Sequence, residues 1–396
     1  MGFGTVGSGI YEILKNNAAE IEKRMGEEVK VKHILDIRDF SGHEDAELFT
    51  NDYSVILNDG SVSVVAEVIG GIEPSLSFTK SALSAGKSVV TSNKELVATH
   101  GTELMELARE NGVSYLFEAA VGGGIPLIRP LYRCLAANNI EKIMGILNGT
   151  TNYILTKMIE DGKSFDEALS LAQSKGYAER NPAADVEGTD ACRKIAILSS
   201  LALGSYVDCA KVSTEGISNI DAADVKYADA LDSDIKLIGY AEIRGERAYA
   251  RVSPMLIRRD NPLACAKGVF NAVLLRGDSV GDVMFYGRGA GKLPTASAVL
   301  GDILDICRNK GASMSWDAEV CGSFIGDGEI KTGILARVKD DDKAEFVGKY
   351  PDAIEINAGI EGESGFVVSS VSEEELKSIK AEKIIRTEEN FMSLPA

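Results

Sequence analysis

The chain has 396 residues, of which 45% are hydrophobic and 26% are charged. This composition is ordinary for a globular protein, and the length predicts two or three domains. The formal net charge is −18 and no lysine–arginine cluster occurs, which argues against binding to nucleic acid or to an anionic membrane. Without an apolar run of membrane-spanning length, a signal-peptide pattern or paired cysteines, we expect a cytoplasmic protein with reduced thiols.

The first third of the chain alternates predicted strands with predicted helices. A glycine-rich turn over Gly2–Gly7 leads into one long helical pattern that includes Ile21, and apolar–polar alternation predicts a strand over Val29–Asp36. The strands expected next are Ser63–Ile69, Lys87–Thr91 and Val113–Glu118, separated by helices over 74–85 and 93–111. Strands that alternate with helices in this way predict a doubly wound, Rossmann-type parallel sheet.

The pattern changes after Pro130. A strand over Ile143–Leu147 is followed by helices as far as Leu203, which are expected to cover strands near 238–243, 248–252 and 273–275. This order predicts a second domain of the α+β class. An alanine-rich helix over Thr295–Asn309 then follows the glycines at 287–291 and is expected to return to the first domain.

The tail from Ile325 differs in character from the two preceding regions. Its expected elements are strands over 331–339, 353–357, 365–371 and 382–386, with helices over 344–349 and 373–380. Strands and helices in the order βαββαβ are typical of a small ferredoxin-like module.

We therefore expect three domains. They are a dinucleotide-binding domain over 1–128 completed by 292–324, an α+β domain over 129–291, and a module over 325–396. In this fold a strand precedes the glycine-rich turn, and no such strand stands before Gly2, so we expect the first strand of the sheet to be missing.

The turn at the start of the chain has the pattern of a dinucleotide-binding loop. Gly2 makes the tight turn, Gly4 lets the backbone approach a pyrophosphate, and Gly7 lets the helix pack closely, while the helix N-terminus stabilises phosphate charge. Asp36 ends the next strand and would accept a hydrogen bond from the ribose of NAD. Arg38 would pair with the 2′-phosphate of NADP, so the sequence leaves the preference between the two cofactors open.

The chain has only three histidines, so lysine, tyrosine or a carboxylate is expected to carry any proton transfer. Asp190 and Lys194 are four residues apart on one face of a predicted helix, downstream of Asp185. One interpretation is a surface ion pair with little energetic weight. The apolar sequence after Lys194 favours a buried, functional pair instead. Lys94, at a strand-to-helix turn, is either a cleft residue or a solvated lysine at a helix start.

Several stretches together resemble the homoserine dehydrogenase family, as far as about Phe324. They are Gly2–Gly7, Thr91–Glu95, Phe117–Pro126, Asn148–Leu155, Gly176–Glu179, Asp185–Lys194 and Gly289–Ala296. The resemblance implies reversible NAD(P)H-dependent reduction of L-aspartate 4-semialdehyde to L-homoserine, in threonine, methionine and isoleucine biosynthesis. It also implies that 129–291 is a substrate and dimerisation domain, that the chain forms a homodimer or higher homo-oligomer, and that the tail is an ACT-type regulatory module.

The resemblance assigns roles to particular residues. Lys194 would give a proton to the carbonyl oxygen, and Lys94 would be the second lysine of the cleft. The residues expected to bind substrate are Gly176, Glu179, Asp185 and Asp190. Those expected to contact NAD or NADP, besides the three glycines, Asp36 and Arg38, are Phe3, Thr5, Val6, Thr91, Lys94 and Gly289. A sodium ion would be held by Glu118 and by the backbone carbonyls of Val121, Gly123 and Ile125.

Two other functions were weighed against this one. A semialdehyde dehydrogenase needs a nucleophilic cysteine, and no cysteine stands in a convincing nucleophile context. A protein that senses dinucleotides without catalysis is the second alternative, and the expected absence of the first strand leaves it open.

Overall fold

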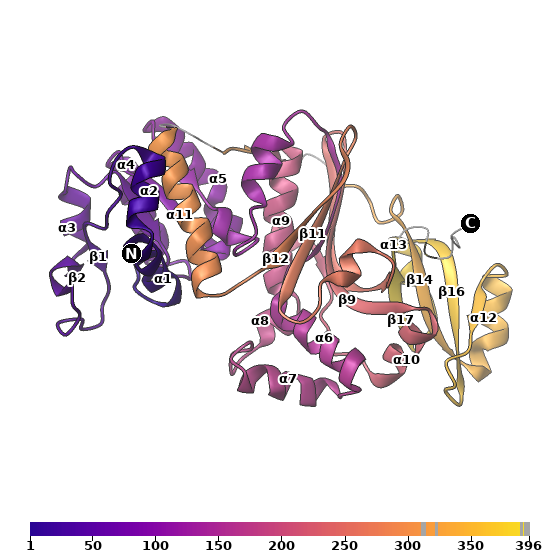
Figure 1. The fold of residues 1–396 in the computed structure, drawn as a ribbon. Helices are drawn as coiled ribbons and strands as arrows, with labels where there is room; N and C mark the ends of the chain where they lie inside the picture. The colour runs from indigo at the N-terminus through magenta and orange to yellow at the C-terminus, as the bar shows by residue number, and fades with distance from the viewer. Residues whose placement is uncertain (310–313, 321–323, 389–390, 392–396) are drawn as a thin grey trace. The chain divides into compact units, whose positions relative to one another are not determined.

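The computed structural model describes residues 1–309, 314–320, 324–388 and 391 (Figure 1). The chain forms two compact units. Unit 1 comprises Met1–Asn139, Ala196–Cys209 and Gly287–Val320; unit 2 comprises Ile140–Ile195, Ala210–Tyr286 and Cys321–Ala396. Within the described ranges, none of the helices has both the length and the hydropathy needed to cross a membrane.

Unit 1 contains the predicted parallel sheet. Strands β3 (Val64–Glu67), β4 (Ser88–Thr91) and β5 (Tyr115–Leu116) pair in parallel in that order. Helices α4 (Ser75–Ser84) and α5 (Lys94–Glu110) connect them, so the alternation of strands and helices is as predicted. Because the strands are parallel, their carboxyl ends share one edge of the sheet, where Glu67 and Thr91 lie opposite each other.

The start of the chain departs from the prediction in two ways. The long first helix is two helices, α1 (Thr5–Asn16) and α2 (Ala18–Met25). The predicted strand over Val29–Asp36 is reduced to β1 (Ile34–Leu35), which pairs with β2 (Phe49–Thr50) in a separate small sheet. A cavity of about 440 Å³ lies between Val29–His33 and β3, so the alternating residues at 29–33 have no neighbouring strand there to pair with.

Helix α11 (Lys292–Arg308) belongs to unit 1 and packs along α1, which confirms that the chain returns to the first domain after the second. Figure 1 shows the orange helix beside the indigo one. The packing leaves no space at Gly9, where a β-carbon would lie 2.9 Å from the Ala296 β-carbon.

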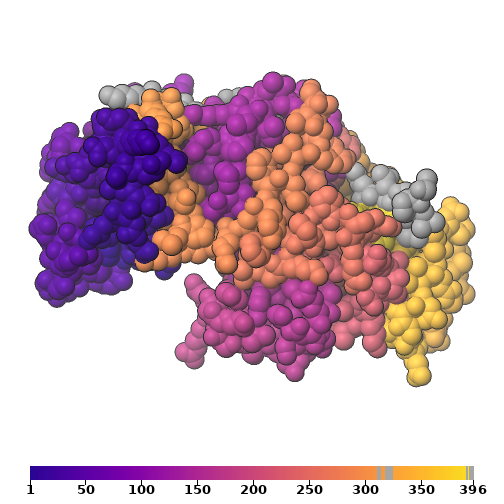
Figure 2. All heavy atoms as spheres, viewed as in Figure 1, coloured from indigo at the N-terminus to yellow at the C-terminus, as the bar shows by residue number. Residues whose placement is uncertain are grey.

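Unit 2 is built on a sheet whose strands pair in the order β12-β11-β6-β9-β10. They are β6 (Ile140–Ile146), β9 (Ser233–Arg244), β10 (Arg247–Arg258), β11 (Phe270–Gly277) and β12 (Gly281–Arg288), the last of which the sequence analysis missed. The helices of the unit are α6 (Gly149–Asp161), α7 (Phe165–Ser174), α8 (Ala183–Val186), α10 (Ala222–Ala230) and the first part of α9 (Thr189–Leu203), whose residues from Ala196 onward belong to unit 1. Figure 2 shows the magenta atoms of the α6–α7 region at the molecular surface.

The tail has the predicted βαββαβ order. Its elements are β14 (Lys331–Lys339), α12 (Lys343–Lys349), β15 (Ile354–Ile356), β16 (Glu363–Ser372), α13 (Glu373–Leu376) and β17 (Lys383–Thr387). The strands pair antiparallel in the order β17-β14-β16-β15. The tail has an apolar core of its own, which includes Phe346 and Phe366. Strand β17 also pairs in parallel with β10, with Met255 opposite Arg386, so the tail continues the sheet of unit 2.

Four short elements complete the description. They are α3 (Tyr53–Asn58), β7 (Ser205–Tyr206), β8 (Ser213–Thr214) and β13 (Asp317–Val320).

Candidate functional site

The local protein geometry requires two of the three glycines of the N-terminal loop, Gly2 and Gly7. Gly2 has φ +87°, a conformation that side chains disfavour, and its N–H donates to the Leu35 carbonyl at 2.8 Å. A β-carbon on Gly7 would lie 2.0 Å from the Gly2 carbonyl oxygen. At Gly4 a β-carbon would meet no protein atom within 4 Å, so this face of the loop is open to a ligand.

Helix α1 begins at Thr5, with Gly4 at the N-cap and no side chain capping its free backbone N–H groups. Its first turn carries no acidic residue, and Thr5 is exposed. Uncapped N–H groups and the positive end of the helix dipole form an anion-binding position, as the glycine pattern predicts.

Asp36 lies at the same loop. Its carboxylate accepts a hydrogen bond from the Phe3 N–H at 2.7 Å and pairs with both sides of the Arg38 guanidinium, at 2.8 and 2.9 Å. The Arg38 hydrogen bond holds the pKa of Asp36 well below its usual range. Arg38 is exposed and stacks over the Phe40 ring, 5.1 Å from its centre. The structure therefore brings together the two residues expected to contact the ribose of NAD and the 2′-phosphate of NADP.

The edge of the parallel sheet is organised by a residue that the sequence analysis missed. Glu67 is fully buried, accepts the Thr91 hydroxyl at 2.6 Å and accepts the Ile69 N–H at 2.8 Å. Thr91 in turn accepts the N–H of Asn93, whose side chain caps α5 at Leu96. Lys94 is the first residue of that helix and is half-buried, so its position is fixed by this chain of hydrogen bonds.

The glycine-rich stretch after β5 packs against the loop at Gly289. A β-carbon on Gly123 would lie 2.2 Å from the Gly289 carbonyl oxygen, and the Gly124 N–H donates to Arg288 at 3.0 Å. The Glu118 carboxylate is already engaged: it accepts three backbone N–H groups, from Leu127, Ile128 and Arg129, at 2.6 to 2.7 Å. A cation here would therefore meet backbone carbonyls rather than this carboxylate.

In the described parts of the chain, no group of three histidine, cysteine, aspartate or glutamate residues is placed to hold a metal ion. The buried carbonyl-bearing residues Val121, Gly123 and Ile125 lie on the turn that follows Glu118, and oxygen ligands of this kind suit a hard cation.

The second group of candidate residues lies in unit 2, at the start of α9. The Lys194 side chain is 9% exposed, and its ammonium donates to the Asp190 carboxylate at 2.7 Å and to the Leu147 carbonyl at 2.8 Å. The Asp190 side chain is 4% exposed. The interpretation as a solvated surface pair is therefore wrong, because both charges are withdrawn from water.

Asn148 joins this pair to the upstream acid. Its amide nitrogen donates to Asp185 at 2.7 Å and to Asp190 at 2.8 Å, while its amide oxygen caps α6 by accepting the Thr151 N–H at 2.9 Å. Asn148 begins one of the stretches that resemble the family, but no role was predicted for this residue. Its position immediately before a helix was the available signal.

Two predicted substrate-binding residues lie on the loop between α7 and α8. Gly176 has φ +73° and is exposed, and Glu179 is exposed with its backbone carbonyl accepting from the Gln173 amide at 3.1 Å. The neighbouring Tyr177 anchors the loop, since its carbonyl accepts the Thr150 hydroxyl at 2.7 Å. The part that Gly176 and Glu179 take in substrate binding stays a prediction.

Two family models match the chain. Residues 2–118 match the homoserine dehydrogenase NAD-binding domain and residues 126–304 match the homoserine dehydrogenase domain. A homoserine dehydrogenase of Synechocystis sp. is 47% identical over 311 residues, 77% of this chain and 72% of the relative. One from Bacillus subtilis is 41% identical over 330 residues, 82% of this chain and 75% of the relative.

Solved structures give the same result. A homoserine dehydrogenase from Thiobacillus denitrificans superposes with a TM-score of 0.87 at 34% identity, covering 98% of this chain and 97% of that one. A hyperthermophilic archaeal homoserine dehydrogenase in complex with NADPH has a TM-score of 0.66 at 31% identity, covering 77% of this chain and 95% of that one.

Proposed function

The chain belongs to the homoserine dehydrogenase family, and we propose that Lys194 is its proton-transfer residue. The activity is the NAD(P)H-dependent reduction of L-aspartate 4-semialdehyde to L-homoserine, a step in amino-acid biosynthesis. The observation that carries the assignment of Lys194 is its burial together with Asp190, 2.7 Å away.

The chemistry calls for a cation beside the reacting oxygen. When bound, the reduced nicotinamide supplies a hydride to the carbonyl carbon, which leaves negative charge on the oxygen. The Lys194 ammonium stabilises that charge and then protonates the oxygen. Asp190 compensates the ammonium charge in its buried position, while the Leu147 carbonyl fixes its direction.

The carboxylates around Lys194 are proposed to hold the substrate's amino group. Asp185 and Asp190 face one amide, that of Asn148, so they are kept close together despite their like charge. We assign Glu179 and Gly176 to the same substrate, on the loop before α8, and Lys94 to a supporting role in binding cofactor or substrate. An ammonium group is recognised by carboxylates through charge-assisted hydrogen bonds.

Unit 1 is proposed to bind the dinucleotide through the N-terminal loop. Gly2, Phe3, Gly4, Thr5, Val6 and Gly7 would surround the pyrophosphate, with Thr91 and Gly289 alongside. The exposed Arg38 supports NADP, whereas Asp36 supports NAD, and comparing the KM values for NADPH and NADH decides between them. In an Arg38→Ala variant the KM for NADPH should rise by more than the KM for NADH.

A sodium ion is proposed on the turn after Glu118. The backbone carbonyls of Val121, Gly123 and Ile125 would bind it, with Glu118 contributing through its own backbone oxygen because its carboxylate is engaged. Replacing sodium with potassium in a thermal-unfolding assay tests this, and an unchanged Tm would contradict it.

We also propose that the tail, 325–396, is an ACT-like module and that the chain forms a homodimer. The ferredoxin-like strand order and the separate apolar core support the first proposal. Titrating activity with threonine tests whether this module confers feedback, and light scattering in solution gives the oligomeric state.

The pH dependence of the two directions tests the role of Lys194. Homoserine oxidation needs the neutral lysine as proton acceptor, so its rate should rise toward alkaline pH, while reduction runs well near neutrality. The small neutral fraction of an ordinary lysine, whose pKa is about 10.4, rises with each unit of pH from about pH 6 to about pH 10, so an oxidation rate that stays flat over this span would contradict the assignment.

A further inference from the structure

A short stretch of unit 2 lies between the tail and the loop over 186–188, where helix α8 with Asp185 leads into α9. We call residues 213–221 the linking segment. It begins with β8, which pairs in parallel with β10, and the Glu215 N–H extends this pairing by donating to the Val252 carbonyl at 2.8 Å. It ends at Asp221, whose side chain caps α10. Both ends of the segment are therefore anchored to regular elements.

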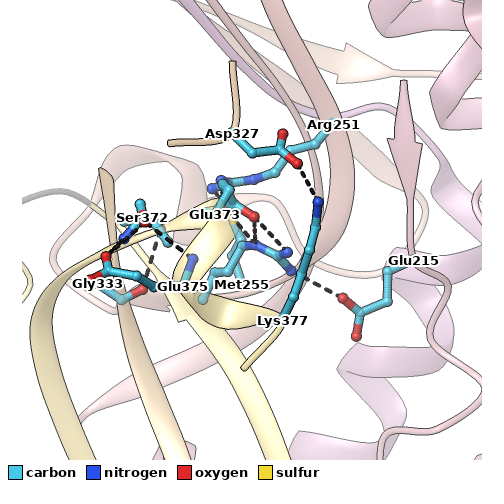
Figure 3. A network of polar contacts seen from close by, with 11 residues as sticks. Glu215, Arg251, Met255, Asp327, Gly333, Ser372, Glu373, Glu375 and Lys377 are labelled. Carbon is cyan, nitrogen blue, oxygen red and sulfur yellow. Dashed lines mark hydrogen bonds and ion pairs between the residues drawn. The ribbon is translucent and has the colours of Figure 1, made fainter. Parts of the chain in front are cut away.

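The tail holds one side of the linking segment through cations. Arg386 of β17 pairs with the Glu215 carboxylate at 3.1 Å, as Figure 3 shows at the Glu215 side chain. Lys383 donates to the Asn219 carbonyl at 3.1 Å, and Arg337 of β14 pairs with Asp221 at 2.9 Å. These contacts come from two strands of the tail and are spread along the segment.

Arg386 is itself placed by a buried carboxylate of the tail. Glu373 is 5% exposed and binds Arg386 through both oxygens, at 2.8 and 2.9 Å. It also pairs with Arg251 of β10 (Figure 3). Because Glu373 fixes the Arg386 guanidinium, the ion pair between Arg386 and Glu215 ties the Glu215 carboxylate to the tail.

The other side of the linking segment directly contacts the loop over 186–188. The Ile217 N–H donates to the Val186 carbonyl at 2.8 Å, and the Ser218 hydroxyl bonds the Glu187 carboxylate. A β-carbon on Gly216 would lie 2.3 Å from the Val186 carbonyl oxygen and 2.6 Å from the Glu187 α-carbon. The two backbones are therefore in contact with no space between them.

The loop residues that the segment touches adjoin both carboxylates of the site. Val186 follows Asp185, and the Gly188 carbonyl accepts the Cys192 N–H at 2.9 Å, which starts the helix that carries Asp190. A displacement of this loop would change the spacing between the Asp185 and Asp190 carboxylates that Asn148 bridges.

We propose that Glu215 and Gly216 are positioning residues through which the tail sets the geometry of the substrate-binding carboxylates. This rests on the roles proposed above for Asp185 and Asp190.

The first test compares Glu215→Gln with Lys377→Gln in the full chain. Lys377 forms an ion pair with Asp327 at 2.6 Å that also involves the tail, but this pair is more exposed than that of Arg386 with Glu215 and lies outside the linking segment (Figure 3). Glu215→Gln should raise the KM for aspartate semialdehyde about two- to fivefold, the range of a partly exposed ion pair. Its kcat and its Kd for NADPH should stay at the wild-type values, and Lys377→Gln should change none of the three.

The second test is structural. Glu215→Gln should speed amide hydrogen exchange in Asp185–Gly188, Glu215→Asp should restore much of the protection, and Gly216→Ala should have a larger effect than either. Wild-type KM and wild-type exchange in Glu215→Gln would overturn the proposal, as would an equal effect of Lys377→Gln. If Asp190→Asn also binds substrate normally, the proposed function has failed; if Asp190→Asn alone impairs binding, only this inference has.

Discussion

Two of the buried lysines of unit 2, Lys194 and Lys236, differ in the charge of the groups that they contact. Lys194 faces the Asp190 carboxylate at 2.7 Å, whereas Lys236 of β9, 1% exposed, donates to two neutral oxygens, the Ala266 carbonyl at 2.8 Å and the Asn152 amide at 3.2 Å. Burial lowers the pKa of Lys236 to about 8. Burial alone therefore does not identify a catalytic lysine; the carboxylate that compensates its charge does.

The largest expected effect separates the two lysines by turnover. Lys194→Ala should lower kcat by about 10²- to 10⁴-fold, the usual contribution of a general acid, while fluorescence titration shows unchanged NADPH affinity. Lys236→Met, a matched replacement of the other buried lysine, should keep wild-type kcat. Wild-type turnover in Lys194→Ala, or an equal loss in Lys236→Met, would remove the distinction.

The next effect concerns the carboxylate itself. Asp190→Asn keeps the shape of the side chain but leaves the Lys194 ammonium without its buried counter-ion. Losing one partner of a buried ion pair costs about 2 kcal/mol or more, so kcat/KM for aspartate semialdehyde should fall by at least about 30-fold. Glu187→Gln, at a more exposed acid of the same loop, serves as the control. A wild-type kcat/KM in Asp190→Asn would show that the counter-ion is not what distinguishes Lys194.

A smaller effect is the pH dependence of stability caused by Lys236. Its pKa in the folded chain, about 8, is below the ordinary lysine value of 10.5, so the unfolded chain binds the extra proton between those pH values. The free energy of unfolding should therefore rise from pH 8 to pH 10.5, by on the order of 2 kcal/mol relative to Lys236→Met. Urea unfolding at pH 7.5, 9 and 10.5 measures it, and parallel curves for the two proteins would contradict the prediction.

The smallest effect would make Lys236 resemble Lys194. Asn152→Asp gives Lys236 a carboxylate at the position of the present amide oxygen, which favours the charged lysine. The rise in stability between pH 8 and pH 10.5 should then shrink to about 1 kcal/mol or less, despite an overall loss from the missing amide donors. An undiminished rise would mean that burial, and not the absence of a counter-ion, governs Lys236.

Features set by local sequence were predictable. Gly2, Gly4 and Gly7 form the tight turn that their spacing predicts. Asp190 and Lys194 lie on one face of a helix and pair, as their four-residue separation predicts. The tail's order of elements followed from alternation and turn residues. Strand limits at Val29–His33 failed because the same alternation appears with or without a neighbouring strand to pair with.

What the sequence does not reveal is pairing between distant residues. Asn148 lies 37 and 42 residues from the two carboxylates that it bridges, and Glu67 meets Thr91 across 24. The parallel pairing of Met255 with Arg386 joins the tail to the sheet of unit 2, and no periodicity in either strand indicates it. Such contacts are specified by the packing of the whole unit.

The closeness of Gly7 to Gly2 has a thermodynamic consequence. The loop is held in shape by protein contacts alone: the Gly2 carbonyl against Gly7, the Gly2 N–H on Leu35, and the Phe3 N–H on Asp36. A loop that is ordered before its ligand arrives loses little conformational entropy on association, so most of the contact energy appears as affinity. The entropy lost on ordering the loop is part of the free energy of folding of unit 1 instead.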